Sequence, residues 1–119
     1  MNKMLVVEDD TLTQKMMGRI FQGDFEIDFC ESVAEYYEKY SNTNYNIIIM
    51  DVSLQGGKNG LELIKEIKGV PSYKSTPILC LTAHSQPKMR KLAIRSGAAL
   101  FITKPVSNST LKEAVGFLV

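Results

Sequence analysis

The sequence predicts an α/β protein with a doubly wound, five-stranded parallel sheet and helices on both faces. Short apolar runs rich in Ile, Val and Leu are nearly continuous, as strands buried on both faces are. Stretches with helical spacing of apolar residues separate these runs, so strands and helices alternate and right-handed crossovers connect the strands. A chain of 119 residues is the size of one domain, and we expect residues 1–119 to form one.

The apolar runs define the predicted strands. Four of the runs are almost wholly apolar, whereas the second run alternates between apolar and polar residues, which is typical of an edge strand. In chain order, the expected strands cover residues 4–7, 25–30, 47–50, 78–81 and 100–102.

The predicted helices have recognisable ends. Thr11 with Gln14, and Ser32 with Glu35, have the spacing of a capping box. Glycines that can adopt a left-handed C-terminal conformation follow three of the helices, at Gly23, Gly69 and Gly97. The helices are expected near residues 11–22, 32–40, 60–68, 87–96 and 108–118.

Composition and charge exclude several classes of protein. The apolar share of 45% and the charged share of 23% are those of an ordinary globular protein. The formal net charge of +1 provides no broad positive surface for nucleic acid. No apolar run has the length of a membrane span or of a signal peptide, so we expect a cytoplasmic protein that does not insert into a membrane. Cys30 and Cys80 lie in apolar runs without metal-ligand spacing and are expected to be buried, reduced thiols.

Polar residues follow four of the five predicted strands. In an open parallel sheet, ligands bind beyond the carboxyl ends of the strands, where the strand order reverses. If the first and third strands are neighbours, three carboxylates converge in one crevice there. The residues at these strand ends are Glu8, Asp9, Asp51, Thr82 and Lys104.

This set of residues predicts a magnesium site. Three close carboxylates raise one another's pKa values unless a cation neutralises them. Oxygen donors favour Mg²⁺, and zinc is disfavoured because no Cys or His is placed to bind it. Asp9 and Asp51 are the candidate direct ligands, and Glu8 is better suited to hold a metal-bound water.

The same arrangement can transfer a phosphoryl group. A carboxylate oxygen of Asp51 can attack phosphorus in line while the metal ion neutralises the incoming charge. Lys104 would pair with one phosphoryl oxygen, and the Thr82 hydroxyl would donate a hydrogen bond to another. Asp51 is therefore the candidate nucleophile.

Four short motifs each lie at a predicted strand end: Leu5-Val6-Val7-Glu8-Asp9-Asp10, Ile49-Met50-Asp51, Leu81-Thr82-Ala83 and Thr103-Lys104-Pro105. With these motifs in this order, the chain resembles the receiver domains of response regulators, including those of the chemotaxis-regulator type. The resemblance covers essentially the whole chain. It implies a flavodoxin-like fold with strand order 2-1-3-4-5.

The resemblance also implies a role for each site residue. Glu8 and Asp9 would be the acidic pair of a Mg²⁺ site, and the main-chain carbonyl of Ser53 would be a further ligand. Asp51 would be the phosphoacceptor. Thr82 would be the switch hydroxyl, Phe101 the switch aromatic and Lys104 the family's conserved lysine, and the Lys104-Pro105 peptide bond would be cis.

A receiver domain implies a place in a two-component phosphorelay. The phosphoryl donor would be a phosphohistidine of a histidine kinase or histidine phosphotransfer protein. The chain would be no classical enzyme, because it would catalyse only its own phosphorylation and dephosphorylation. The face formed by the fourth helix, fifth strand and fifth helix would act on a downstream target or on a domain of a parent protein, such as a hybrid histidine kinase. The resemblance also allows a weak or phosphorylation-dependent dimer.

Two features depart from the common pattern of the family, and the roles of two others remain open. The segment 54–60 looks one residue longer than the commonest form, and Gln55 stands where the family often has proline. His84 either borders the phosphoryl site or is an exposed loop residue. The basic residues of the fourth helix form either a solvated face or part of the output surface: Lys88, Arg90, Lys91 and Arg95.

Other classes of protein stay as alternatives. A degenerate receiver could act as an interaction module without phosphorylation. A haloacid-dehalogenase-like phosphohydrolase also uses a strand-end Asp and Mg²⁺, but it has Asp-x-Asp where this chain has Glu8-Asp9-Asp10. In a flavodoxin-like cofactor-binding module, three acids in the first loop would repel the cofactor's phosphate. A P-loop enzyme is excluded because the Gly-x-x-x-x-Gly-Lys segment is missing.

Overall fold

Five parallel strands form one sheet with the order β2-β1-β3-β4-β5. The computed structural model describes residues 2–52, 59–83 and 86–119. The strands are β1 (Asn2–Val7), β2 (Phe25–Cys30), β3 (Ile47–Met50), β4 (Ile78–Thr82) and β5 (Leu100–Thr103). The predicted α/β class, strand order and edge position of the second strand are confirmed.

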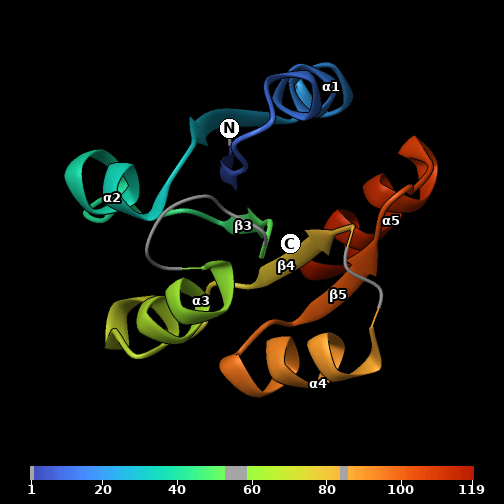
Figure 1. Ribbon diagram of the computed structural model, residues 1–119. Coiled ribbons are helices and arrows are strands. Elements are labelled where there is room, and N and C mark those ends of the chain that lie inside the picture. Colours follow the sequence, from blue (N-terminus) through green and yellow to red (C-terminus); the bar gives the residue numbers. More distant parts are fainter. Residues whose placement is uncertain (1, 53–58, 84–85) are drawn as a thin grey trace.

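Helices follow each strand, and all five predicted helices are present (Figure 1). The regular helices are α1 (Thr11–Phe21), α2 (Val33–Glu35), α3 (Gly60–Lys68), α4 (Pro87–Ser96) and α5 (Asn108–Leu118). The helix predicted at residues 32–40 continues from α2 as a π-helical turn, η1 (Tyr36–Tyr40). A 3₁₀ turn, η2 (Pro71–Tyr73), which the sequence analysis did not predict, follows α3.

The helices cover the two faces of the sheet in unequal numbers. Figure 1 shows α1 and α5 on one side of the sheet and α2, α3 and α4 on the other. Alternate residues of β1 enter the two cores: Met4 and Val6 pack on the α1 and α5 side, and Leu5 and Val7 pack on the opposite side. The central strand β3 contributes Ile48 and Met50 to one core and Ile47 and Ile49 to the other, so it is wholly apolar.

Two helix ends differ from the prediction. The N-cap of α1 is Asp10, because its extended backbone lets the carboxylate accept the amide hydrogen bond of Thr13 at 3.0 Å. Gly69 has a right-handed φ of −77°, since its amide bonds the last turn of α3 and the chain continues into η2. The other caps agree with the prediction: Ser32 caps α2, and Gly97 ends α4 with φ of 120°.

Both cysteines are free and buried, as predicted. The strand register places Cys30, Val7, Met50 and Cys80 in one row across four neighbouring strands. Within the part of the chain that the structure describes, no helix combines the length and apolar character that crossing a membrane would require.

Candidate functional site

Two carboxylates lie next to each other where β1 and β3 end. Val7 and Met50 are partners in the register of these strands, and the Asp51 amide donates to the Val7 carbonyl at 3.0 Å. Glu8 and Asp51 are therefore the next residues on two adjacent strands. Their exposed fractions are 4% and 8%, so both acids are buried.

Lys104 joins these acids from the end of β5. Its Nζ lies 2.7 Å from Glu8 Oε1 and 3.4 Å from Asp51 Oδ2. The Lys104 amide donates to the Thr82 carbonyl at 2.8 Å, which continues the pairing of β4 with β5. The Lys104-Pro105 bond is cis, as predicted. Three residues that are 43 or more positions apart in the chain thus meet at the carboxyl edge of the sheet.

The electrostatics of the site reflect burial and close charges. Burial raises the pKa of Glu8 most strongly, and the Asp51 charge raises it further, while the hydrogen bonds from Lys104 and the Asp10 amide act in the opposite direction. Burial alone would lower the pKa of Lys104, but its contacts with Glu8 and Asp51 outweigh this and leave the pKa raised. The lysine therefore stays protonated and partly neutralises the two acids.

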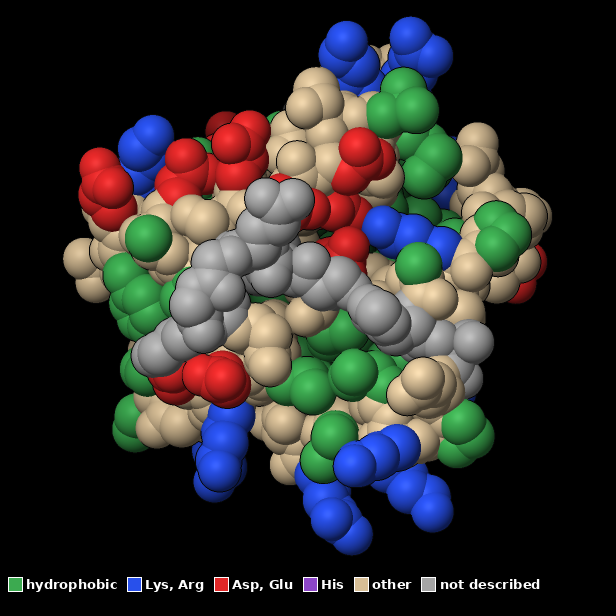
Figure 2. Space-filling model, viewed as in Figure 1, with side chains coloured by type: hydrophobic (Ala, Val, Ile, Leu, Met, Phe, Trp, Pro, Cys, Tyr) green, Lys and Arg blue, Asp and Glu red, His purple; other side chains and the backbone are tan. Residues whose placement is uncertain are grey.

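Asp9 follows Glu8 at the end of β1 and is half-buried. It lines a hollow of about 520 Å³ together with Asp10, Glu31, Ser32 and Glu35. Figure 2 shows acidic side chains gathered in the upper half of this face of the molecule. Among residues 2–52, 59–83 and 86–119, no three acidic, histidine or cysteine side chains lie close enough together to hold a metal ion. The contacts of Lys104 thus join Glu8 and Asp51 at this edge of the sheet.

The two predicted switch residues are both inside the protein. Thr82 ends β4 and is fully buried. Phe101, in β5, packs in the core on the side of α4, in the same cluster as Ala93. The Arg90 side chain donates to the Phe101 carbonyl at 3.4 Å, so α4 and β5 are joined at this point. Ser53, Gln55 and His84 lie outside the described residues.

The sequence analysis missed two contacts at the site. The Asp10 amide donates to Glu8 Oε2 at 3.2 Å, which holds the second oxygen of Glu8. The side chain of Gln14 donates to the Glu8 carbonyl at 2.6 Å, so this residue fixes the β1–α1 turn. Its spacing from Thr11 indicated a role near the helix start, but the partner depends on how α1 turns back over β1.

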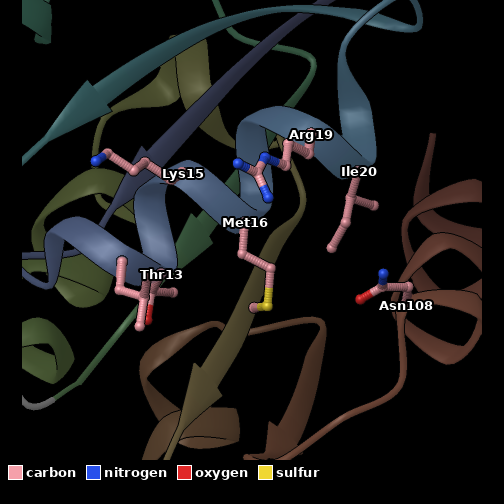
Figure 3. Close-up of a pocket in the computed structure, with 7 residues that line it drawn as sticks. Thr13, Lys15, Met16, Arg19, Ile20 and Asn108 are labelled. Atoms are coloured by element: carbon pink, nitrogen blue, oxygen red, sulfur yellow. The ribbon is translucent and has the colours of Figure 1, made fainter.

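The sequence analysis also missed a hollow of about 500 Å³ on the surface between α1 and α5. Figure 3 shows Met16 and Ile20 extending from α1 on the side of Asn108, and Lys15 and Arg19 also line the hollow. Leu12, another lining residue, is 76% exposed. Leu12 is an apolar residue on the otherwise polar side of the predicted helix, and this exception to the pattern could have indicated the hollow.

Comparison with protein families gives the deciding observation: the model described as the response regulator receiver domain matches residues 4–116. The chain belongs to this family. The receiver domain is 29% identical over 116 residues to the regulatory protein VanRB of Enterococcus faecalis. This match covers 98% of the chain and 51% of that protein. It is 28% identical over 114 residues to the chemotaxis protein CheY of Halobacterium salinarum, covering 95% of the chain and 92% of that protein. The receiver domain thus spans about half of the first relative and most of the second.

Solved structures agree with the fold. The chemotaxis response regulator CheY4 of Vibrio cholerae has a TM-score of 0.90 and 27% identity, with 100% of this chain and 99% of that chain covered. The receiver domain of the sensor histidine kinase PA1611 from Pseudomonas aeruginosa has a TM-score of 0.87 and 19% identity, with 98% and 96% covered. That second structure was solved with a magnesium ion coordinated in its active-site cleft.

Proposed function

We propose that this receiver domain accepts a phosphoryl group on Asp51 from a phosphohistidine of a histidine kinase or histidine phosphotransfer protein. The observation that carries the proposal is the position of Asp51. It is buried at the end of the central strand β3, and Lys104 Nζ lies 3.4 Å from its Oδ2. A carboxylate held beside a fixed ammonium can act as a nucleophile whose phosphorylated product is also stabilised.

The residues present fit a Mg²⁺ ion by their chemistry. Glu8, Asp9 and Asp51 supply only oxygen donors, which Mg²⁺ prefers, and the raised pKa of Glu8 reflects burial beside another negative charge. The main-chain carbonyl of Ser53 would be a further ligand, as the resemblance implies. When bound, Mg²⁺ would supply the positive charge that lets these acids and a phosphoryl group occupy one site.

The transfer itself uses groups of this chain. A carboxylate oxygen of Asp51 forms the new bond to phosphorus, the phosphorus–nitrogen bond of the phosphohistidine breaks, and the imidazole leaves with the bonding pair and takes up a proton. The ammonium of Lys104 pairs with a phosphoryl oxygen. The Thr82 hydroxyl donates to another oxygen once the side chain moves toward the acyl phosphate.

The movement of Thr82 links phosphorylation to the surface. It would vacate space into which Phe101 turns, and the face formed by α4, β5 and α5 would change shape for a downstream target or a domain of a parent protein. Shifting such an equilibrium from 1:99 to 99:1 needs about 5.5 kcal/mol of differential binding. Two or three charge-assisted hydrogen bonds to the phosphoryl group are of this size. Any dimer would be weak or would depend on phosphorylation.

A phosphorylation experiment tests the proposal. The protein is incubated with Mg²⁺ and a small phosphodonor such as acetyl phosphate, and mass spectrometry locates the modification. We expect one phosphoryl group on Asp51, which is lost when Mg²⁺ is chelated and in Asp51→Asn. The matched control Asp24→Asn changes an exposed carboxylate away from the site and should be phosphorylated normally. Label on another residue would contradict the proposal, and no label at all would favour an interaction module that works without phosphorylation.

A further inference from the structure

Helix α3 begins directly against the main chain of Asp51. Its first residue, Gly60, is buried, and the Gly60 amide donates to the Val52 carbonyl at 3.2 Å. A Cβ at residue 60 would lie 2.4 Å from the Asp51 carbonyl oxygen and 2.7 Å from Val52 Cα. These are main-chain atoms, which cannot rotate away as the end of a side chain can. Only glycine fits this close approach.

The Asp51–Val52 peptide is consequently held from two sides. On the side of β1, the Asp51 amide donates to the Val7 carbonyl at 3.0 Å. On the other side, the first turn of α3 lies against the Asp51 carbonyl. Asn59 fixes that turn, because its side chain caps α3 by accepting from the Glu62 amide at 3.0 Å.

We infer that Gly60 is a positioning residue for phosphorylation: it lets α3 hold the Asp51 peptide at the place from which the carboxylate can attack in line. This inference rests on the proposed function. Ordinary contact begins at 3.4 Å, so a methyl group at residue 60 would have to move the peptide or the helix by about 1 Å. A displacement of about 1 Å can lower the rate of a positioned reaction roughly 100-fold.

A pair of alanine substitutions at the two ends of α3 tests the inference. Gly60→Ala adds the methyl group at the Asp51 peptide. Gly69→Ala adds it at the other end, where φ is −77° and the nearest atoms would lie at an ordinary 3.4 Å. The rate of Asp51 phosphorylation is measured with Mg²⁺ over a range of acetyl phosphate concentrations. We expect Gly60→Ala to lower the rate constant at saturating donor by about 10- to 100-fold, with a half-saturating concentration changed by less than about threefold. Gly69→Ala should change neither.

The measurements are made in a background that favours folding. Gly18→Ala and Gly116→Ala place alanine within α1 and α5, where it favours the helix over glycine. A Cβ at residue 18 would meet Phe29 at an ordinary 3.6 Å, and at residue 116 it would meet nothing within 4 Å. Backbone NMR of the folded Gly60→Ala protein gives a second readout: the amide resonances of Asp51 and Val52 should shift while those of α5 stay unchanged.

Each outcome bears on one claim. A folded Gly60→Ala protein that is phosphorylated at the rate of its background overturns the inference and leaves the proposed function intact. If Gly60→Ala does not fold even in this background, Asn59→Ala is used, because it loosens the same turn without adding an atom. It should lower the rate constant by roughly 3- to 10-fold, and an unchanged rate would overturn the inference. Failure of the background protein itself to be phosphorylated at Asp51 would instead overturn the proposed function.

Discussion

Helices α3 and α4 cover the same face of the sheet, yet they are attached to it very differently. Helix α3 follows β3, the strand directly before Asp51, and α4 follows β4, which ends at Thr82 (Figure 1). The first helix buries Gly60, Leu63, Ile64 and Ile67. Helix α4 lies wholly within the described residues, and Ala93 is its one fully buried residue.

This difference separates the chemistry from the switch. Local opening costs less where few apolar side chains are buried, so α4 should open or shift more easily than α3. The proposed phosphoacceptor is held by the firmly packed helix. The proposed switch residues Thr82 and Phe101 lie beneath the loosely packed one. A site that must keep its geometry and a surface that must change are thus supported by different helices.

The largest expected effect compares two isoleucines. Ile64 in α3 is fully buried, whereas Ile94 in α4 is 46% exposed. Ile64→Ala should lower the free energy of unfolding by about 2–5 kcal/mol, because it leaves a cavity in the core. Ile94→Ala should change it by less than about 0.5 kcal/mol. Urea unfolding followed by circular dichroism measures both, and equal losses would contradict the proposed difference between the helices.

Lys104→Met tests how the charges around Asp51 are balanced. Removing the ammonium leaves Glu8 and Asp51 buried without their cation, so the free energy of unfolding should fall by roughly 2–3 kcal/mol at pH 7. Because the folded pKa of Lys104 is raised, its stabilisation is complete below the ordinary lysine value, about 10.4, and is lost as the pH rises through the folded value. The difference between wild type and variant should therefore shrink above about pH 10.4.

The control for this variant is Lys112→Met, which changes an exposed lysine of α5. It should leave stability within about 0.5 kcal/mol of wild type at pH 7. A difference between wild type and Lys104→Met that grew at alkaline pH would contradict the assigned charge balance.

Lys68→Met should have a smaller effect at the far end of α3. The Lys68 ammonium donates to the main-chain carbonyls of Tyr73, Lys74 and Thr76 at 2.7 to 3.0 Å, which ties α3 to the segment before β4. Their loss should lower the free energy of unfolding by about 1–2 kcal/mol. Lys65→Met, on the exposed side of the same helix, is the matched control and should be nearly neutral. Equal stabilities of the two variants would show that these three bonds contribute nothing.

The smallest expected change concerns the attachment of α4. Arg90→Gln removes the 3.4 Å hydrogen bond to the Phe101 carbonyl, a long bond that should contribute less than about 1 kcal/mol. Native-state hydrogen exchange should show faster exchange in α4 and unchanged exchange in α3. The exchange of wild-type α4 should already be faster than that of α3, and the reverse order would argue against our interpretation of the two helices.

The strands and the charged edge of the sheet could be predicted from the sequence because local patterns determine them. Continuous apolar runs such as residues 47–50 identify buried strands, and the polar residue after each run must lie at the carboxyl edge of a parallel sheet. This pattern predicts that Glu8, Asp51 and Lys104 lie together, as they do in the structure.

Other features depend on how elements pack and have no local signal. Asp10 and Thr11 are both good N-cap residues, and the path from β1 into α1 decides between them. The three carbonyl partners of Lys68 and the contact of Gly60 with Asp51 arise only when α3 lies on the sheet. Gly69 looked like a left-handed cap, but the chain continues into η2 without the reversal that such a cap provides.

The row of residues from Cys30 to Cys80 provides two built-in reporters of unfolding. The two thiols are separated by three strand spacings, roughly 14 Å, which is too far for a disulfide within the folded chain. Both cysteines are fully buried, so a thiol reagent can reach them only when the protein opens. Cys30 is on the edge strand β2 and Cys80 on the interior strand β4, so unequal labelling rates would distinguish fraying of the edge from unfolding of the whole sheet.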